Sequence, residues 1–249
     1  MKRFSRYAAL MAMATLTLFA TNSHAFLGEA VANASWSIGL KGGATYHTLY
    51  GDGLSDVLED VLRPQVDELA ADPRWWFYGG GFVSMHFNKC LALQLEVFYH
   101  RTGLQYDGEV GGDGFDIEFD IDYLAIPLLL KMTAPYYGDL VRPFMVVGPY
   151  LDIKLNAESG GLDAVPAAVT DLGYLTGVGD DIGDEVNPVD AGVMLGVGLD
   201  IKAGPGYLQL EARGALGFND VFDSEELGLN AENVKNAYLM LGGAYAFEF

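Results

Sequence analysis

Three features are scarce in this sequence, and each absence excludes a class of protein. Cys90 is the only cysteine, so an intramolecular disulfide and a cysteine metal cluster are excluded. Only 14 lysines and arginines stand against 34 aspartates and glutamates, which gives a net charge of -20. Such a chain has too few cations to neutralise a phosphate backbone, so nucleic acid is excluded as a partner. No apolar run reaches the roughly 18 residues of a membrane-spanning helix.

The first 25 residues have the three parts of a secretory signal peptide. Basic residues lie within the first six positions, an apolar stretch follows over residues 8–20, and Ser23-His24-Ala25 offers a cleavage site. We expect cleavage after Ala25, with Ala34 as the alternative. Residues 26–249 would then form a single exported domain.

The exported part alternates between apolar and polar residues with a period of two. In the clearest segment, CLALQLEVFYH, leucine and valine take the odd positions while Gln94 and Glu96 take even ones. A strand that crosses a bilayer needs roughly nine to eleven residues, with aromatic residues at both interfaces. The alternating segments match this pattern, and they cover residues 35–47, 75–87, 90–100, 189–202, 207–218 and 236–249.

Residues 115–132 also alternate, but they change phase. Apolar residues take the odd positions up to Ile121 and the even positions from Leu124. Because a slip of one residue moves side chains to the other face, we expect a bulge near Asp122 and Tyr123.

Residues 141–155 are apolar on both faces, so their phase stays unassigned. They contain Pro143 and Pro149, and proline disturbs a paired strand because it has no backbone N–H. With this segment, the expected number of strands is about eight, an even number as in bacterial barrels.

Short and long connections alternate along the chain. The short ones lie near residues 88–89, 133–140 and 203–206, and the long ones near 48–74, 103–114, 155–187 and 219–234. In outer-membrane barrels, short turns lie in the periplasm and long loops outside. The sequence therefore predicts an all-β, closed, up-and-down antiparallel transmembrane β-barrel of about eight strands, with long extracellular loops. We expect it in the outer membrane of a Gram-negative bacterium, with both termini in the periplasm.

The chain ends with aromatic residues at alternate positions, Tyr245, Phe247 and Phe249. An apolar terminal residue needs an apolar surrounding, so we expect this face to contact lipid. Phe249 also resembles the C-terminal signal that the barrel-assembly machinery reads in outer-membrane proteins. The expected partners are therefore this machinery, outer-membrane lipid and lipopolysaccharide.

Two neighbouring runs resemble the PorT-like outer-membrane β-barrel family. Members commonly carry a Tyr-Leu-x-Ile-Pro-Leu strand followed by a Pro-x-x-x-x-Gly-Pro strand, which DYLAIPLLLKM and VRPFMVVGPYLDIKL match here. The resemblance implies a small outer-membrane barrel but no single activity, since members include assembly factors, adhesins and barrels of unknown role. It implies no catalytic motif. The chain differs from the usual pattern at Ala125, where an acidic residue is common, and in its very acidic loops.

Four charged residues should face the lumen at similar depth: Lys41, Glu96, Glu211 and Arg213. An eight-stranded barrel is just wide enough for side chains to fill it. Since unpaired charges there would be costly, we interpret the four as a hydrogen-bonded plug. The alternative is a proton path or a catalytic dyad.

A hydrolase is a weaker alternative, built on Ser84 and His86 with Glu96 or His100. Strand geometry places Ser84 and His86 about 7 Å apart, which is long for nucleophile activation. The chain has no G-x-S-x-G and no H-E-x-x-H motif. We therefore expect no enzymatic activity and no cofactor.

The loops carry most of the negative charge. In the first loop, apolar residues at helical spacing follow Ser55, a candidate N-cap, and Pro64 could begin a second short helix. The third loop contains Asp180, Asp181, Asp184 and Glu185, which could hold a divalent cation although their spacing is not that of an EF-hand. We interpret the acidic loops as a solvated surface that could also bridge to lipopolysaccharide through divalent cations.

The sequence therefore predicts a small monomeric barrel with a structural or surface-interaction role, such as adhesion or assembly, carried by its acidic loops. A general porin is excluded because an aqueous channel needs about sixteen strands. Two alternatives remain open. One is a ligand-binding or transport barrel for small apolar molecules, with a lateral gap near Pro143, Pro149 or the glycine-rich strands. The other is an outer-membrane lipid hydrolase.

Overall fold

The computed structural model describes residues 34–50, 68–73, 75–110, 113–134, 140–160, 187–220 and 235–249. These residues form ten strands of one sheet. The strands are β1 (Ser35–Tyr50), β2 (Glu68–Pro73), β3 (Trp75–His86), β4 (Leu91–Val110), β5 (Asp113–Ala125), β6 (Leu128–Thr133), β7 (Val141–Gly160), β8 (Val189–Ala203), β9 (Gly206–Asp220) and β10 (Lys235–Glu248). Within the described ranges, no helix is long and apolar enough to cross a membrane.

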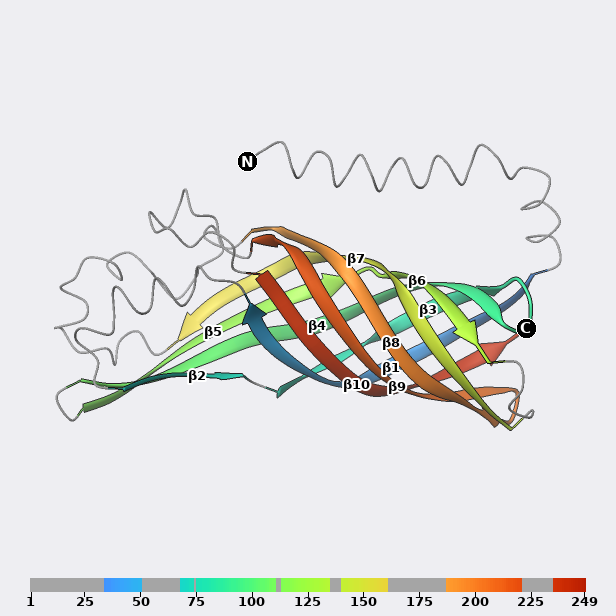
Figure 1. Cartoon of the computed structure of the whole chain (residues 1–249), viewed down its shortest axis with the longest axis horizontal. Helices are drawn as coiled ribbons and strands as arrows, with labels where there is room; N and C mark the ends of the chain where they lie inside the picture. The colour runs from blue at the N-terminus through green and yellow to red at the C-terminus, as the bar shows by residue number, and fades with distance from the viewer. Residues whose placement is uncertain are drawn as a thin grey trace.

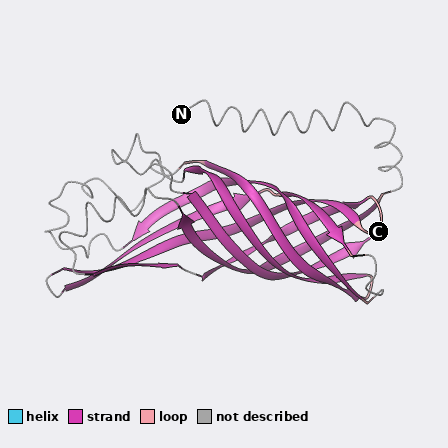
Figure 2. Cartoon of the chain, in the orientation of Figure 1, coloured by secondary structure: helices cyan, strands magenta, loops and turns pink. Residues whose placement is uncertain are grey.

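The sheet closes on itself as an antiparallel barrel (Figures 1 and 2). Around the wall the order is β1, β3, β4, then β5 with β6, then β7, β8, β9 and β10, and β10 pairs with β1 from Ser37↔Glu248 to Tyr50↔Lys235. Both β5 and β6 lie between β4 and β7, so together they form one interrupted strand of the wall. Strand β2 pairs only with the far part of β4. Without β2, and with β5 and β6 counted once, the ten strands make the predicted closed barrel of eight.

One end of the barrel holds the short connections and the C-terminus, and we call it the turn end. There the backbones of Trp36 and Phe249 exchange two hydrogen bonds of 3.1 and 2.9 Å. Asn88 Oδ1 accepts hydrogen bonds from the backbone N–H groups of Cys90 and Leu91, which fixes the connection from β3 to β4. Gly204 takes a φ of 61° in the two-residue turn from β8 to β9, a conformation that favours glycine. The opposite end is called the loop end.

The long connection predicted near residues 103–114 is wrong. Strand β4 continues to Val110 and pairs directly with β5 from Asp113, which leaves a two-residue turn. Strand β2 adds to the same sheet, although we expected residues 68–73 to belong to a helical loop. The remainder of that first loop, residues 51–67, lies outside the described residues. We call the extension at the loop end the projecting sheet, and it comprises β2 and residues 104–110, 113–119 and 158–160 (Figure 1).

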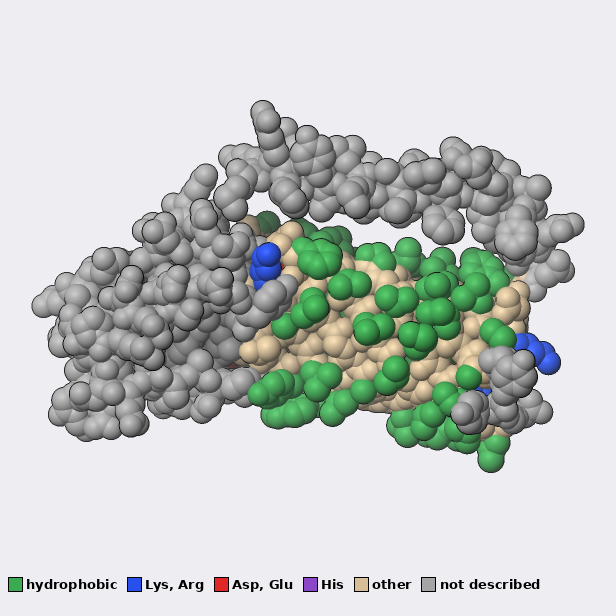
Figure 3. Space-filling model, in the orientation of Figure 1, with side chains coloured by type: hydrophobic (Ala, Val, Ile, Leu, Met, Phe, Trp, Pro, Cys, Tyr) green, Lys and Arg blue, Asp and Glu red, His purple; other side chains and the backbone are tan. Residues whose placement is uncertain are grey.

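The alternation of side chains separates an apolar outer wall from a mostly filled lumen. Leu40 is 76% exposed and Phe77 is 61% exposed on the outer wall, whereas Leu129 and Met194 are completely buried inside. Figure 3 shows hydrophobic side chains spread over the visible wall, with Lys and Arg only near its two ends. This is the distribution expected of a barrel surrounded by lipid.

The register shift predicted near Asp122 and Tyr123 is confirmed, but it lies on the partner strand. Asp122 pairs with Asn156 while Tyr123 pairs with Lys154, so Leu155 is the extra residue on β7. Strand β5 keeps its phase, since Tyr123 and the odd positions on either side of it are buried. Ile121 therefore faces the lumen together with Tyr123 and Ala125.

The proline-containing strand β7 has a clear phase in the structure. Pro143 and Pro149 take the outward positions, and the buried residues between them face the lumen. Pro149 lies beside the break between β5 and β6, where Glu96 N–H donates to Pro127 O at 3.0 Å. The strands remain tightly adjoined there, because a Cβ on Gly148 would overlap the backbone carbonyl of Leu128. The wall has no lateral gap at this position.

Gly148→Ala should destabilise the barrel by about 1–3 kcal/mol, because its Cβ would meet the backbone of β6, which cannot move aside easily. The matched control is Gly214→Ala on β9, where an added Cβ meets nothing within 4 Å. Urea titration of folding into lipid vesicles measures both changes. Equal stability of the two variants would contradict the tight approach of β6 and β7.

Candidate functional site

The structure brings the four predicted lumen residues together in one layer, which we call the charge quartet. Lys41 comes from β1, Glu96 from β4, and Glu211 and Arg213 from β9. All four side chains take inward positions of their strands, and none is more than 7% exposed. Three strands that are distant in sequence thus supply one compact group.

Each carboxylate of the quartet contacts both cations. The Arg213 guanidinium donates to both oxygens of Glu96 at 2.8 Å and to Glu211 Oε2 at 2.7 Å. Lys41 Nζ lies 3.0 Å from Glu96 Oε2 and 2.8 Å from Glu211 Oε1. Two positive and two negative charges therefore cancel, and the bidentate contact to Glu96 fixes the orientation of the guanidinium.

Neutral side chains add hydrogen bonds to the two carboxylates of the quartet, while Arg213 Nε is buried and has no acceptor. Gln94 donates to Glu96 Oε1 and accepts a 2.9 Å hydrogen bond from Ser84 Oγ, and Tyr78 reaches Glu211 at 3.5 Å. These residues were not predicted as part of the site. Their inward phase was readable, but only the register of β3 against β4 brings them to the quartet.

A second polar group lies in the lumen nearer the loop end. Asp152 on β7 and Asp190 on β8 face each other directly across the two strands, and both are buried. Tyr238 OH donates to Asp152 Oδ2 at 3.2 Å, and His100 Nε2 lies at the same distance from that oxygen. Asn236 donates to Asp190 Oδ2 at 3.0 Å. This part of the lumen is therefore acidic, and the sequence analysis did not find it.

The lumen nearer the turn end is basic. Lys131 on β6 pairs with Asp200 on β8 at 2.9 Å and lies 4.0 Å from the ring centroid of Phe144. Arg142 and Lys202 lie close by, over the ring of Tyr207. The described lumen thus passes from acidic at the loop end, through the neutral quartet, to basic at the turn end.

The structure does not assemble the hydrolase considered above. Ser84 donates to Gln94, while His86 Nε2 lies 2.9 Å from Ser37 Oγ. His100 contacts Asp152. Ser84 therefore has no hydrogen bond to either histidine, and nothing in this arrangement would activate its hydroxyl.

The part of the chain that the structure describes contains no group of three or more His, Cys, Asp or Glu side chains arranged to hold a metal ion. The predicted cation site at Asp180, Asp181, Asp184 and Glu185 lies outside the described residues. The structure therefore neither supports nor contradicts that prediction.

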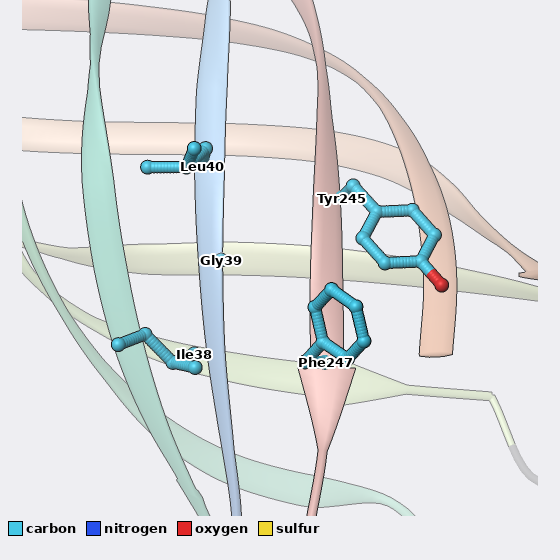
Figure 4. A pocket seen from close by; sticks show the side chains of 5 residues that line it. All are labelled: Ile38, Gly39, Leu40, Tyr245 and Phe247. Atoms are coloured by element: carbon cyan, nitrogen blue, oxygen red, sulfur yellow. The ribbon is translucent and has the colours of Figure 1, made fainter. Parts of the chain in front are cut away.

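The three aromatic residues at the C-terminus, Tyr245, Phe247 and Phe249, face outward, whereas Tyr238 on the same strand faces the lumen. Phe247 is 51% and Phe249 is 76% exposed, and Tyr245 OH donates to Ala203 O at 2.8 Å. Figure 4 shows Tyr245 and Phe247 on β10 beside Ile38 and Leu40 on β1, where they line a shallow apolar hollow. The seam between the first and last strands is thus covered by apolar side chains.

The sequence profile of the family described as an outer membrane protein beta-barrel domain matches residues 21–223. No curated protein is significantly similar to the chain. Strand β10, which closes the barrel, follows the matched region.

Several solved barrels are similar to the chain at low identity. Ail, the attachment invasion locus protein of Yersinia pestis, solved with the heparin analogue sucrose octasulfate, is 13% identical, with 86% of this chain and 99% of that chain covered and a TM-score of 0.38. Neisserial surface protein A is 11% identical, with 86% and 97% covered and a TM-score of 0.45. OprG from Pseudomonas aeruginosa is 13% identical, with 86% and 97% covered and a TM-score of 0.44.

Arg213→Ala should cost about 3–5 kcal/mol of folding free energy, because it leaves two buried carboxylates with a single cation. The matched control is Arg101→Ala. Arg101 also makes a bidentate contact, to Asp122 at 2.6 and 2.9 Å, but its side chain is 29% exposed, and such pairs contribute about 0–1 kcal/mol. Urea titration in lipid vesicles compares the two variants. A loss for Arg213→Ala no larger than that for Arg101→Ala would contradict a tightly coupled quartet.

Proposed function

The chain belongs to the outer membrane protein beta-barrel domain family, and on that basis we propose that it is a barrel with a closed lumen and a structural or surface-interaction role. Its location is the bacterial outer membrane. The proposed role is adhesion or assembly, carried by the loop end of a monomeric barrel. The lumen conducts no solute in this proposal.

The charge quartet is the observation that carries the proposal. Its four side chains come from both sides of a narrow barrel and satisfy one another's charges. An ion that passed through would have to replace these contacts in a poorly hydrated interior, which is costly. This supports a lumen that stays closed.

The projecting sheet is the surface that we assign to the interaction. Its register places acidic residues directly opposite each other, Glu68 against Glu109 and Asp107 against Asp116. Asp and Glu are also frequent in the long connections, and carboxylate oxygens are ligands that divalent cations prefer. We therefore propose that divalent cations join the acidic residues of this surface and of the long connections to lipopolysaccharide.

The orientation and the assembly partner are part of the proposal. The turn end, with both termini, faces the periplasm, as short turns do in bacterial barrels. Tyr245, Phe247 and Phe249 form the signal that the barrel-assembly machinery reads. Their alternate, outward positions on the closing strand support this assignment.

We also propose that the chain is a PorT-like member of its family. The motif residues Ile126-Pro127 and Gly148-Pro149 lie in adjacent strands, at the break between β5 and β6. This motif lies at one specific irregularity of the wall, so it supports family membership better than the alternation of apolar and polar residues, which many barrels share.

The two alternatives are less well supported. A transport barrel needs an opening near Pro143, Pro149 or the glycine-rich strands, and beside Pro149 the backbone of Leu128 leaves no room for a Cβ on Gly148. A lipid hydrolase needs Ser84 beside a base, and Ser84 donates to Gln94 instead. The closed barrel therefore remains the proposal.

Purified protein in a planar bilayer should show no steady ion current at neutral pH, because the quartet blocks the lumen. Replacing residues 106–117 with a two-residue Asn-Gly turn should leave the bilayer silent, since the quartet and not the projecting sheet provides the block. Folding of both proteins is checked by their heat-modifiable mobility on gels. A defined open channel in the folded wild type would overturn the closed lumen and favour transport.

The orientation is tested by labelling intact cells with a membrane-impermeant thiol reagent. In a Cys90→Ser background, Asp113→Cys at the loop end should react, while Asn88→Cys at the turn end should react only after the outer membrane is opened. Both positions lie at hairpin ends, Asp113 paired with Val110 and Asn88 in the connection from β3 to β4. Labelling at residue 88 on intact cells would invert the proposed orientation.

A further inference from the structure

Two cations at the turn end have no ionic partner among the described residues. Arg142 lies on β7 and Lys202 on β8, and both cationic groups lie over an aromatic ring. The whole chain has 34 acidic residues for 14 basic ones. A shortage of carboxylates therefore does not explain why these two cations lack one.

The two cations converge on the ring of Tyr207. The guanidinium carbon of Arg142 lies 4.0 Å from the ring centroid, and Lys202 Nζ lies 5.4 Å from it. Tyr207 pairs directly with Lys202 across β8 and β9. Each cation gains from the ring, but no carboxylate among the described residues neutralises either charge, so both would attract an anion to this part of the barrel.

The guanidinium of Arg142 also has a donor without an acceptor. Its Nε atom is buried and makes no hydrogen bond. The residue directly opposite Arg142 is Asp200, which would be the natural partner, but Asp200 is held by Lys131 at 2.9 Å, and both of those side chains are buried. A buried donor that lacks an acceptor costs free energy, so it points to a group that the described residues do not supply.

We propose that Arg142, Lys202 and Tyr207 form a binding site for a phosphate group at the turn end of the lumen. Arginine offers a planar fork of donors and lysine a mobile point charge, and both suit the oxygens of a phosphate. The centroid of the Tyr207 ring lies within 5.4 Å of both cations. Lys202 is exposed at the end of its strand, so the site is open to the solution at that end. Free phosphate and a phospholipid headgroup share this chemistry.

The proposal is tested on the full mature barrel in an uncharged maltoside detergent at low salt. Inorganic phosphate is titrated while the ¹⁵N signals of the arginine Nε–H groups are followed by NMR. We expect a saturable shift of the Arg142 signal. The Arg142→Lys variant assigns this signal, because the signal is missing from its spectrum. Lys202→Gln should weaken the binding at least about tenfold, in line with the loss of one charge-assisted contact.

Lys89→Gln is the matched control, because Lys89 is an exposed lysine of another turn at the same end. It should leave phosphate binding unchanged. An equal loss of binding with Lys89→Gln would overturn the proposal, because it would show that any positive charge at the turn end attracts phosphate. Lys202 lies at the end of β8, so its replacement tests the site even if variants of Arg142 do not fold. Heat-modifiable gel mobility verifies folding in each case.

A second measurement separates the two sources of phosphate. Native mass spectrometry counts phosphatidylglycerol bound to the wild type and to Lys202→Gln, with diacylglycerol as the phosphate-free control. Binding of free phosphate that depends on Lys202 assigns a soluble anion, whereas Lys202-dependent retention of phosphatidylglycerol alone assigns a lipid headgroup. If neither depends on Lys202, the site is wrong.

Discussion

Closure of the backbone ladder is the constraint on which the rest of this structure depends. A strand in lipid cannot leave its N–H and C=O groups unpaired, so the first and last strands must meet, as β1 and β10 do from Ser37↔Glu248 to Tyr50↔Lys235. Closure with eight strands makes the lumen narrow. A narrow lumen in turn forces inward side chains to satisfy one another, because there is little room for water.

The charges of the lumen follow from that confinement, but they are not evenly distributed. The quartet is neutral, Asp152 and Asp190 make the loop end acidic, and Lys131, Arg142 and Lys202 make the turn end basic. Closure and local pairing account for the quartet alone. The unequal ends need a separate cause, and binding of different ions at each mouth would provide one.

Alternation was sufficient to predict the barrel and the membership of the quartet. The inward phase of Lys41, Glu96 and Arg213 can be read from their own strands. The lumen of an eight-stranded barrel is so narrow that inward side chains at similar depth must contact one another. Alternation of apolar and polar residues does not predict a strand when neither face of the strand contacts lipid or the protein core. Residues 103–114 are polar and rich in glycine, so they resemble a loop, yet residues 103–110 pair with residues 113–120 as the ends of two strands.

Register was the second limit of prediction from the sequence. The pairing of His100 with Asp152 depends on how β4, β5 and β7 are aligned, and single-strand patterns do not carry that information. The same limit explains the bulge. The position near Asp122 was predicted correctly, but the extra residue belongs to β7, which is adjacent in space and not in the predicted strand.

The extra residue at Leu155 has a consequence for how such a chain can evolve. An insertion of one residue within a membrane strand would send every later side chain into the wrong medium. Here the added residue lies beyond the buried Asp152, and the strand resumes its inward phase at Ala157. The loop end can therefore gain or lose an odd number of residues without disturbing the wall beneath it. Diversification of the surface is in this way uncoupled from conservation of the barrel.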